Sequence, residues 1–154
     1  MIRIVLVDDH PLVREGIRGM LARSADIEVV GQAASGPEGV ALAAKLSPDV
    51  VLMDLRMPGG DGVAATREIV AAGTARVMVL TTYESDEDIL RAIEAGAAGY
   101  LLKDIAPDAL AAAIRAAARG ETVLAPSVQS ALLSRMRRVA VASAPSTTVW
   151  AETT

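Results

Sequence analysis

Five short aliphatic runs, each followed by a stretch rich in alanine and leucine, constrain the fold of this chain more than any other feature. The runs are nearly continuous in Val, Ile and Leu, as is typical of strands that are buried on both faces. They are Ile2–Val7, Ile27–Ala33, Val50–Met53, Arg76–Leu80 and Gly99–Leu102. Strand followed by helix, five times over, predicts an α/β fold: a doubly wound, five-stranded parallel sheet with five helices on its two faces.

The stretches between and after these runs carry helix signals. We expect helices over about Pro11–Ala22, Gly36–Leu46, Gly62–Ala72, Asp86–Ala95 and Pro107–Arg119. Pro11 stands where the first turn of a helix tolerates proline. Ser35, followed three residues later by Glu38, has the spacing of a capping box. Aromatic residues make up only 2% of the chain, so the core between helices and sheet must be aliphatic.

Polar side chains follow four of the five predicted strands. Asp8 and Asp9 follow the first strand, Asp54 the third, Thr81 and Thr82 the fourth, and Lys103 the fifth. Each of them alone is most simply a turn, a cap or a solvated residue. The carboxyl ends of parallel strands meet at one edge of a sheet, where ligands bind in such folds. We therefore expect these side chains to form one site.

The chemistry of this predicted site follows from its charges. Three clustered carboxylates repel one another unless a cation lies among them. A cluster with oxygen ligands only favours a hard ion, so Mg²⁺ is the predicted metal. With Mg²⁺ and Lys103 the formal charge of the site is close to zero. Such a site can accept a phosphoryl group, whose oxygens the metal, the ammonium and a hydroxyl would hold.

The remaining composition excludes several classes of protein. The formal net charge is -4, which does not favour a surface that follows a nucleic-acid backbone. Cysteine is absent, which excludes a disulfide framework and fits a reducing, cytoplasmic compartment. The first apolar run ends on two aspartates and no run approaches 18 residues, so we expect neither a signal peptide nor a membrane span. His10, the single histidine, is expected mainly to shape the entry to the first helix.

The pattern changes after Gly120. We expect residues 1–120 to form one domain and residues 121–154 to be a linker in which Ser127–Val139 could form one further helix. The segment VASAPSTTVWAETT at its end is rich in Ser, Thr, Ala and Pro, as flexible linkers are. The basic residues beyond Gly120 are Arg135, Arg137 and Arg138, too few for a recognition surface on DNA.

Three segments together resemble a known family. VDDHPLVREGI, DVVLMDLRMPGGDG and VMVLTTYESDEDILRAIEAGAAGYLLKD are similar to the receiver domain of bacterial two-component response regulators, and DDHP and LLKD resemble the NarL/FixJ branch in particular. The resemblance runs from about Ile2 to Gly120. It implies the flavodoxin-like receiver topology and a phosphorylation-dependent switch that controls transcription through an output domain.

The resemblance also implies roles for individual residues. Asp54 would be the phosphoacceptor, with Thr81 as the switch hydroxyl, Lys103 as the partner of a phosphate oxygen and Tyr100 as the aromatic that follows Thr81. Asp9, Asp54 and the backbone carbonyl of Arg56 would bind Mg²⁺ directly, and Asp8 would bind it through a water molecule. In the family the phosphoryl group comes from a sensor histidine kinase or a small phosphodonor, and phosphorylation commonly leads to a homodimer.

Other classes remain as alternatives. An aspartyl-phosphate phosphohydrolase usually has a second aspartate two residues after the nucleophile, where this chain has Arg56. A flavin carrier would need a Ser/Thr-rich phosphate loop where this chain has Asp8 and Asp9. We therefore expect a receiver and no enzyme. The helix-turn-helix of the NarL/FixJ branch is not recognisable before Thr154, so DNA binding is expected only of a longer protein, and a stand-alone receiver acting on other proteins is the alternative.

Overall fold

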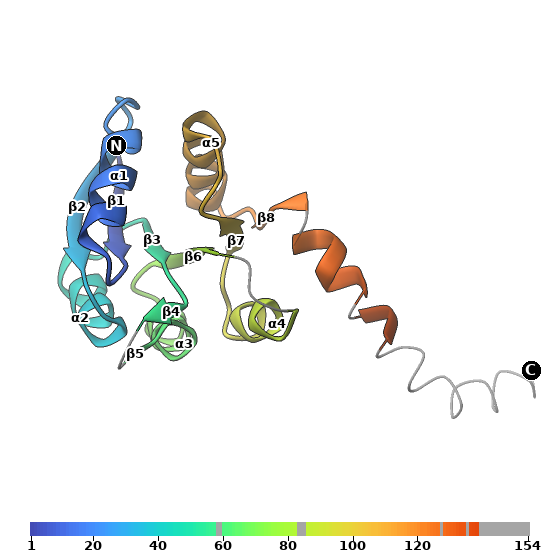
Figure 1. Cartoon of the computed structure of the whole chain (residues 1–154). Helices are drawn as coiled ribbons and strands as arrows, with labels where there is room; N and C mark the ends of the chain where they lie inside the picture. Colours follow the sequence, from blue (N-terminus) through green and yellow to red (C-terminus); the bar gives the residue numbers. More distant parts are fainter. Residues whose placement is uncertain (58–59, 83–85, 127, 135, 139–154) are drawn as a thin grey trace, which may run out of the picture.

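The structure is a computed structural model and describes residues 1–57, 60–82, 86–126, 128–134 and 136–138. The strands and helices follow one another along the chain in the order that the sequence predicts (Figure 1). They are β1 (Ile2–Val7), α1 (Pro11–Leu21), β2 (Ile27–Ala33), α2 (Gly36–Leu46), β3 (Val50–Met53), β4 (Arg56–Met57), β5 (Gly60–Asp61), α3 (Gly62–Ala72), β6 (Arg76–Thr81), α4 (Asp86–Glu94), β7 (Gly99–Leu102), α5 (Pro107–Ala118) and β8 (Val123–Leu124).

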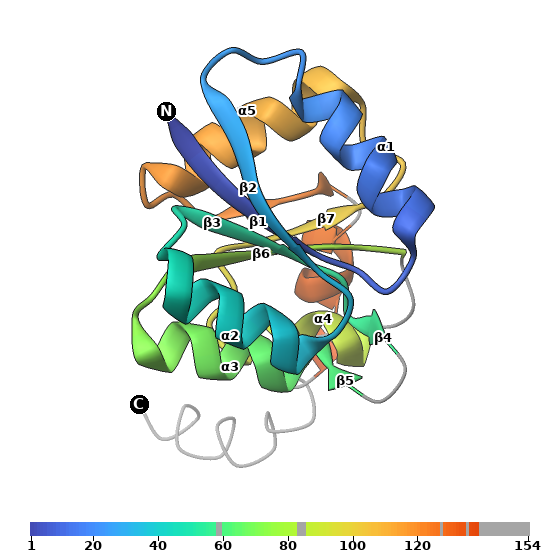
Figure 2. The ribbon, with the colours of Figure 1, turned by 90° about the vertical axis from the view of Figure 1, so that its left-hand side faces the viewer.

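The main sheet is parallel and doubly wound, which confirms the predicted fold class. Its strand order is β2-β1-β3-β6-β7-β8. Helices α1 and α5 cover one face of the sheet, and α2, α3 and α4 cover the other (Figure 2). The order of the strands reverses beside β1, so the carboxyl ends of β1 and β3 lie next to each other at the middle of the sheet.

Alternation along the strands builds the two halves of the core. In β1, Ile4 and Leu6 belong to the cluster beneath α1 and α5, whereas Val5 and Val7 belong to the cluster beneath α2 and α3. A side-chain period of two sends successive residues to opposite faces. Because both faces are covered, nearly every position of these strands is apolar, which explains the continuous runs in the sequence.

Half of the predicted capping box forms at α2. The Ser35 hydroxyl accepts a hydrogen bond from the Glu38 amide at 3.3 Å, whereas the Glu38 carboxylate accepts one from the amide of Ala34, one residue before the cap, at 3.0 Å. Helix ends leave backbone amides without partners, so the bond from Glu38 to Ser35 marks where α2 begins. The other predicted helices end within one residue of the expected positions.

The predicted number of strands was wrong, because the main sheet has six strands and a separate two-stranded ribbon joins β4 and β5. The strands that the sequence did not predict are β4, β5 and β8. Each is two residues long, which is too short for a periodic pattern to be recognised. β8 lies in the stretch expected to be a linker and pairs with β7 at the edge of the sheet. Residues 128–134 and 136–138 are helical, within the expected further helix, and residue 126 just before it is helical too. Among the described residues, no helix combines the length and the apolar character that crossing a membrane requires.

Candidate functional site

The strand order brings the polar strand ends together. β1, β3, β6 and β7 lie side by side in the sheet, with β2 at one edge and β8 at the other. Asp8, Asp54, Thr81 and Lys103 therefore meet at the carboxyl edge of the sheet, as the sequence predicts. Backbone hydrogen bonds hold them in place, since the Asp54 amide donates to the Val7 carbonyl at 3.0 Å and the Lys103 amide donates to the Thr81 carbonyl at 2.9 Å.

Asp54 lies at the centre of this group and is 3% exposed. Its Oδ1 atom accepts a hydrogen bond from the Thr81 hydroxyl at 2.8 Å and one from the Arg56 amide at 3.3 Å. Its Oδ2 atom lies 3.3 Å from the ammonium of Lys103. A buried carboxylate needs such partners to remain ionised. The two oxygens of Asp54 are thus held from different strand ends.

Lys103 is shared between two carboxylates. Its Nζ atom lies 2.8 Å from Asp8 Oδ2 and 3.3 Å from Asp54 Oδ2. Partial burial would lower the pKa of Lys103, but the hydrogen bond to Asp8 and the negative charges of Asp54 and Asp8 outweigh it and raise the pKa. Lys103 therefore provides a fixed positive charge beside Asp54.

Asp8 and Asp9 turn the chain from β1 into α1. The carboxylate of Asp8 is buried, and its Oδ1 atom accepts a hydrogen bond from the His10 amide at 2.9 Å. The Asp9 Oδ1 atom lies 3.0 Å from His10 Nδ1 without the alignment of a hydrogen bond, and it is buried with no hydrogen-bond partner among the described residues. A buried carboxylate oxygen without a donor is costly unless a cation faces it.

This arrangement fits a hard divalent cation. Each of Asp8, Asp9, His10 and Asp54 offers a ligand atom, and these atoms all lie within 4.8 Å of one another. The aspartates contribute oxygens only, which Mg²⁺ prefers. The three aspartates and Lys103 together have a formal charge that a divalent ion would neutralise. The unpartnered oxygen of Asp9 is the feature of the structure that a metal would satisfy.

Two residues that the sequence places in the site lie at its margin. The Arg56 amide contacts Asp54, but the guanidinium is half exposed and forms an ion pair with Asp88 at the start of α4. Tyr100 is fully buried in β7, in a cluster with Ile89 and Ala92 of α4 rather than among the carboxylates. Arg56 thus connects the loop after β3 to α4, while Tyr100 lies between the sheet and the same helix.

Sequence reasoning missed Asp88 and gave His10 mainly a structural role. Asp88 lies 32 residues from Arg56 along the chain, and no local pattern indicates a pair over that separation. His10 does begin α1, but its ring nitrogen also lies 3.3 Å from Asp8 Oδ1. The run of Asp8, Asp9 and His10 was the signal, since three groups able to bind a metal follow one buried strand.

Comparison with known proteins agrees with this geometry. The family described as the response regulator receiver domain matches residues 4–115. The transcriptional regulatory protein LiaR of Bacillus subtilis (strain 168) is 48% identical over 138 residues, which cover 89% of this chain and 65% of LiaR. The chain spans about two thirds of the length of the curated relatives it matches.

Solved structures give the same assignment. The crystal structure of a two-component response regulator of the LuxR family from Aurantimonas sp. SI85-9A1 has a TM-score of 0.81 at 39% identity and covers 87% of this chain and 96% of its own. The isolated receiver domain of RcsB from Salmonella enterica serovar Typhimurium, determined with the phosphomimetic BeF3-, has a TM-score of 0.76 at 29% identity and covers 85% and 98%. With its strand order and its acidic strand ends, this chain belongs to the response regulator receiver domain family.

Proposed function

We propose that this receiver domain is a switch that accepts a phosphoryl group on Asp54. The observation that carries the proposal is the placement of Asp54: a buried carboxylate between Thr81 and Lys103, beside the paired acids Asp8 and Asp9. Aspartyl phosphorylation is the general mechanism of receiver domains, and Asp54 is held by both a hydroxyl and an ammonium.

The proposed reaction is a displacement at phosphorus. A carboxylate oxygen of Asp54 forms a bond to phosphorus, and the bond between phosphorus and the donor breaks. The leaving group keeps the electron pair and takes a proton from the solvent, so the product is an acyl phosphate on Asp54. Lys103 then offers its ammonium to a phosphoryl oxygen, and burial of the site strengthens this attraction.

We propose that Asp9, Asp54 and the backbone carbonyl of Arg56 hold Mg²⁺ directly and that Asp8 holds it through water. When bound, the ion neutralises the negative charge that gathers between the carboxylates and the incoming phosphoryl group. The unpartnered Oδ1 atom of Asp9 supports its place as a ligand. His10 would orient Asp8 through its backbone amide.

Thr81 would read the product. In this structure its hydroxyl is bound to Asp54 Oδ1 at 2.8 Å, so a phosphoryl group on Asp54 changes the acceptor that the hydroxyl meets. Tyr100 lies on β7, the neighbour of the strand that ends on Thr81, and packs beneath α4. A shift of Thr81 would reach α4 through this ring.

In the whole protein we propose a sensor histidine kinase as the donor, a homodimer as the phosphorylated form, and control of transcription through a DNA-binding output domain. The name of LiaR as a transcriptional regulatory protein, and its greater length, support an output beyond the receiver.

Mass measurement of the intact chain after incubation with acetyl phosphate tests the proposal. We expect one phosphoryl group on the wild type with Mg²⁺, none with excess EDTA, and none on Asp54→Ala. Asp104→Ala is the matched control, because Asp104 is an exposed aspartate that follows β7 at the same edge of the sheet. Equal phosphate uptake by wild type and Asp54→Ala would contradict the proposal.

A further inference from the structure

The turn from β1 into α1 is held by a side chain that lies outside the group of acids. Arg14 lies near the start of α1, and its Nη1 atom donates a hydrogen bond to the backbone carbonyl of Asp8 at 2.5 Å. Its Nε atom donates another to the Oε1 atom of Gln32 on β2 at 3.1 Å. The guanidinium therefore joins the helix, the turn and the neighbouring strand, and its planar fork holds both bonds in fixed directions.

The Asp8 carbonyl lies just beyond the end of the sheet. The last residue of β1 is Val7, and the Asp8 amide still donates a hydrogen bond to the Ala33 carbonyl of β2 at 3.0 Å. The Asp8 carbonyl instead accepts its hydrogen bond from Arg14. Asp8 is thus held by β2 through its amide and by α1 through its carbonyl.

This anchoring acts on Asp9 through one peptide plane. The Asp8 carbonyl and the Asp9 amide belong to the same peptide unit, which is planar. A hydrogen bond that fixes the carbonyl limits rotation of this plane, and with it the direction in which the Asp9 side chain leaves the backbone. The Oδ1 atom of Asp9 is buried and has no hydrogen-bond partner among the described residues. The position of this oxygen therefore depends on the backbone and not on a donor.

We propose that Arg14 is a positioning residue of the metal site, which holds the Asp8–Asp9 peptide so that the Asp9 carboxylate lies where Mg²⁺ binds. The inference deepens the proposed function and rests on it, because it requires a divalent ion beside Asp9 and Asp54. Arg14 contacts the backbone of the turn, so it acts through Asp9. Groups that orient the ligands of a metal commonly change its affinity by about 10- to 100-fold.

The charge of Arg14 acts in the opposite direction. A guanidinium near three carboxylates offsets part of their negative charge and repels an incoming cation. If charge were its main contribution, removing the guanidinium would strengthen the binding of Mg²⁺. If position is its main contribution, removing it weakens the binding. The sign of the change in affinity therefore separates the two effects.

Titration calorimetry of the full chain with Mg²⁺, without a phosphodonor, tests the inference. Arg14→Gln removes the charge and the bridge to the Asp8 carbonyl, and we expect it to weaken the binding of Mg²⁺ about tenfold. Arg14→Lys keeps the charge but cannot form both bonds of the fork, so it should weaken the binding as well. Gln32→Ala removes the outer partner of the guanidinium and should cause a smaller loss of affinity.

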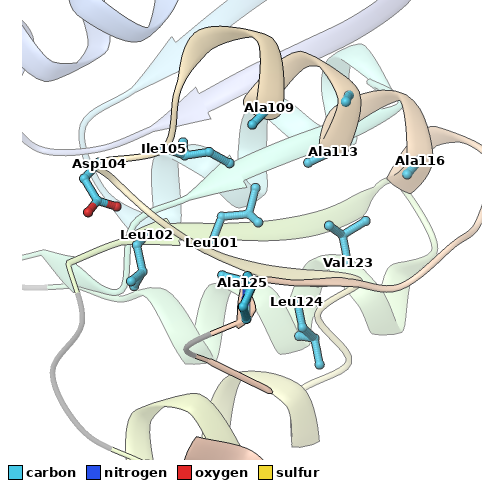
Figure 3. A pocket seen from close by; sticks show the side chains of 12 residues that line it. Leu101, Leu102, Asp104, Ile105, Ala109, Ala113, Ala116, Val123, Leu124 and Ala125 are labelled. Carbon is cyan, nitrogen blue, oxygen red and sulfur yellow. The ribbon is translucent and has the colours of Figure 1, made fainter. Parts of the chain in front are cut away.

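Two controls address charge and stability. Arg18→Gln removes the same charge one turn further along α1, where the side chain is exposed, and should bind Mg²⁺ as the wild type does. Val123 pairs with Gly99, at the opposite end of β7 from Lys103. Its side chain lines a groove of about 610 Å³ between α5 and the β7–β8 edge, with Ala113 on the α5 side (Figure 3). Val123→Ala should therefore lower the melting temperature and leave the affinity for Mg²⁺ unchanged.

Phosphate uptake from acetyl phosphate, measured against Mg²⁺ concentration, gives a second readout. In Arg14→Gln the Mg²⁺ concentration at half-maximal rate should rise about tenfold, while the rate at saturating Mg²⁺ stays close to that of the wild type. Equal or tighter binding of Mg²⁺ by Arg14→Gln overturns the inference and leaves the proposed function intact, and so does an equal loss of affinity in Arg18→Gln. A wild type that binds no Mg²⁺ contradicts the proposed function, and the inference falls with it.

Discussion

At the scale of single residues, the site has an excess of negative formal charge, from three aspartates and one lysine. Asp8 and Asp54 share one ammonium, and Asp9 lies beside them. The Lys103 Nζ atom is 2.8 Å from Asp8 and 3.3 Å from Asp54. The ammonium therefore holds the acceptor without neutralising it. The Thr81 hydroxyl is the second support of Asp54. In the proposed function, Asp54 carries the chemistry and Thr81 reads the product, so the two roles belong to different residues.

Thr81→Ala should separate these two roles. The variant keeps Asp54, Lys103 and the acids, so we expect it to take up one phosphoryl group under the conditions that label the wild type. It lacks the hydroxyl that reads the product, so hydrogen exchange in α4 and β7 should no longer respond to phosphorylation. Intact mass and hydrogen exchange measured on the same sample check both statements. A variant that fails to take up phosphate as completely as Asp54→Ala would show that the roles are not separate.

At the scale of elements, the start of α3 packs against the backbone of Asp54 and Leu55. Gly62 begins α3 and is buried. A Cβ atom added there would collide with the Asp54 carbonyl oxygen and lie 2.8 Å from the Leu55 Cα atom. Both neighbours are backbone, which cannot rotate away as a flexible side chain can. The start of α3 and the end of β3 are therefore matched in shape at Asp54, the proposed phosphoacceptor.

Gly62→Ala should destabilise the fold and disturb Asp54 together. We expect a loss of about 1–3 kcal/mol in the free energy of unfolding, as for other overpacked sites, and slower phosphate uptake. Gly16→Ala is the control, because Gly16 lies inside α1 with nothing within 4 Å of an added Cβ atom. Alanine in an open helical position should stabilise by about 0.5–1 kcal/mol. Urea denaturation measures both, and equal effects of the two substitutions would refute the shape argument.

At the scale of the whole molecule, four strand ends from both sides of the sheet centre meet at the site. A ligand that bridges them stabilises the folded chain and not the unfolded one, because only folding brings the carboxylates together. Tyr100 of β7 shares a buried cluster with α4, and β7 pairs with the strand that ends on Thr81. The sheet thus connects the site to α4.

Mg²⁺ should raise the melting temperature of the wild type. At 100 times its dissociation constant a ligand adds about 2.7 kcal/mol to the stability of the folded state. In Asp9→Ala the increment should shrink, while the melting temperature without metal should equal or exceed that of the wild type, because one of three repelling carboxylates is gone. Thermal denaturation with a Mg²⁺ titration checks both values. An unchanged increment in the variant would place the ion elsewhere.

The 154-residue chain should not bind DNA. Its formal net charge is -4, and beyond Gly120 its bases are Arg135, Arg137 and Arg138. One short cluster neutralises too few phosphates to overcome repulsion from an acidic domain. Fluorescence anisotropy with random duplex at low salt is the measurement. Salt-sensitive binding at micromolar concentration would contradict this expectation and would indicate an output function in this chain.

The sequence by itself determined the features that repeat locally. Apolar runs of four to seven residues that alternate with helical stretches predicted β1, β2, β3, β6 and β7 to within one residue, because strands buried on both faces cannot carry polar side chains. The polar residues that end those runs predicted which side chains gather at one edge of the sheet. The strand order of the sheet places these side chains next to one another.

The tertiary structure alone decided features that depend on contacts between distant parts of the chain. β8 forms because β7 offers an unpaired edge. A strand of two residues is too short to show a periodic pattern in the sequence. The ion pair of Arg56 with Asp88 and the choice of Asp8 as the nearer partner of Lys103 depend on distances that no spacing in the sequence encodes. Local patterns specify where elements begin and which face they bury, whereas packing decides which exposed edges and charges find one another.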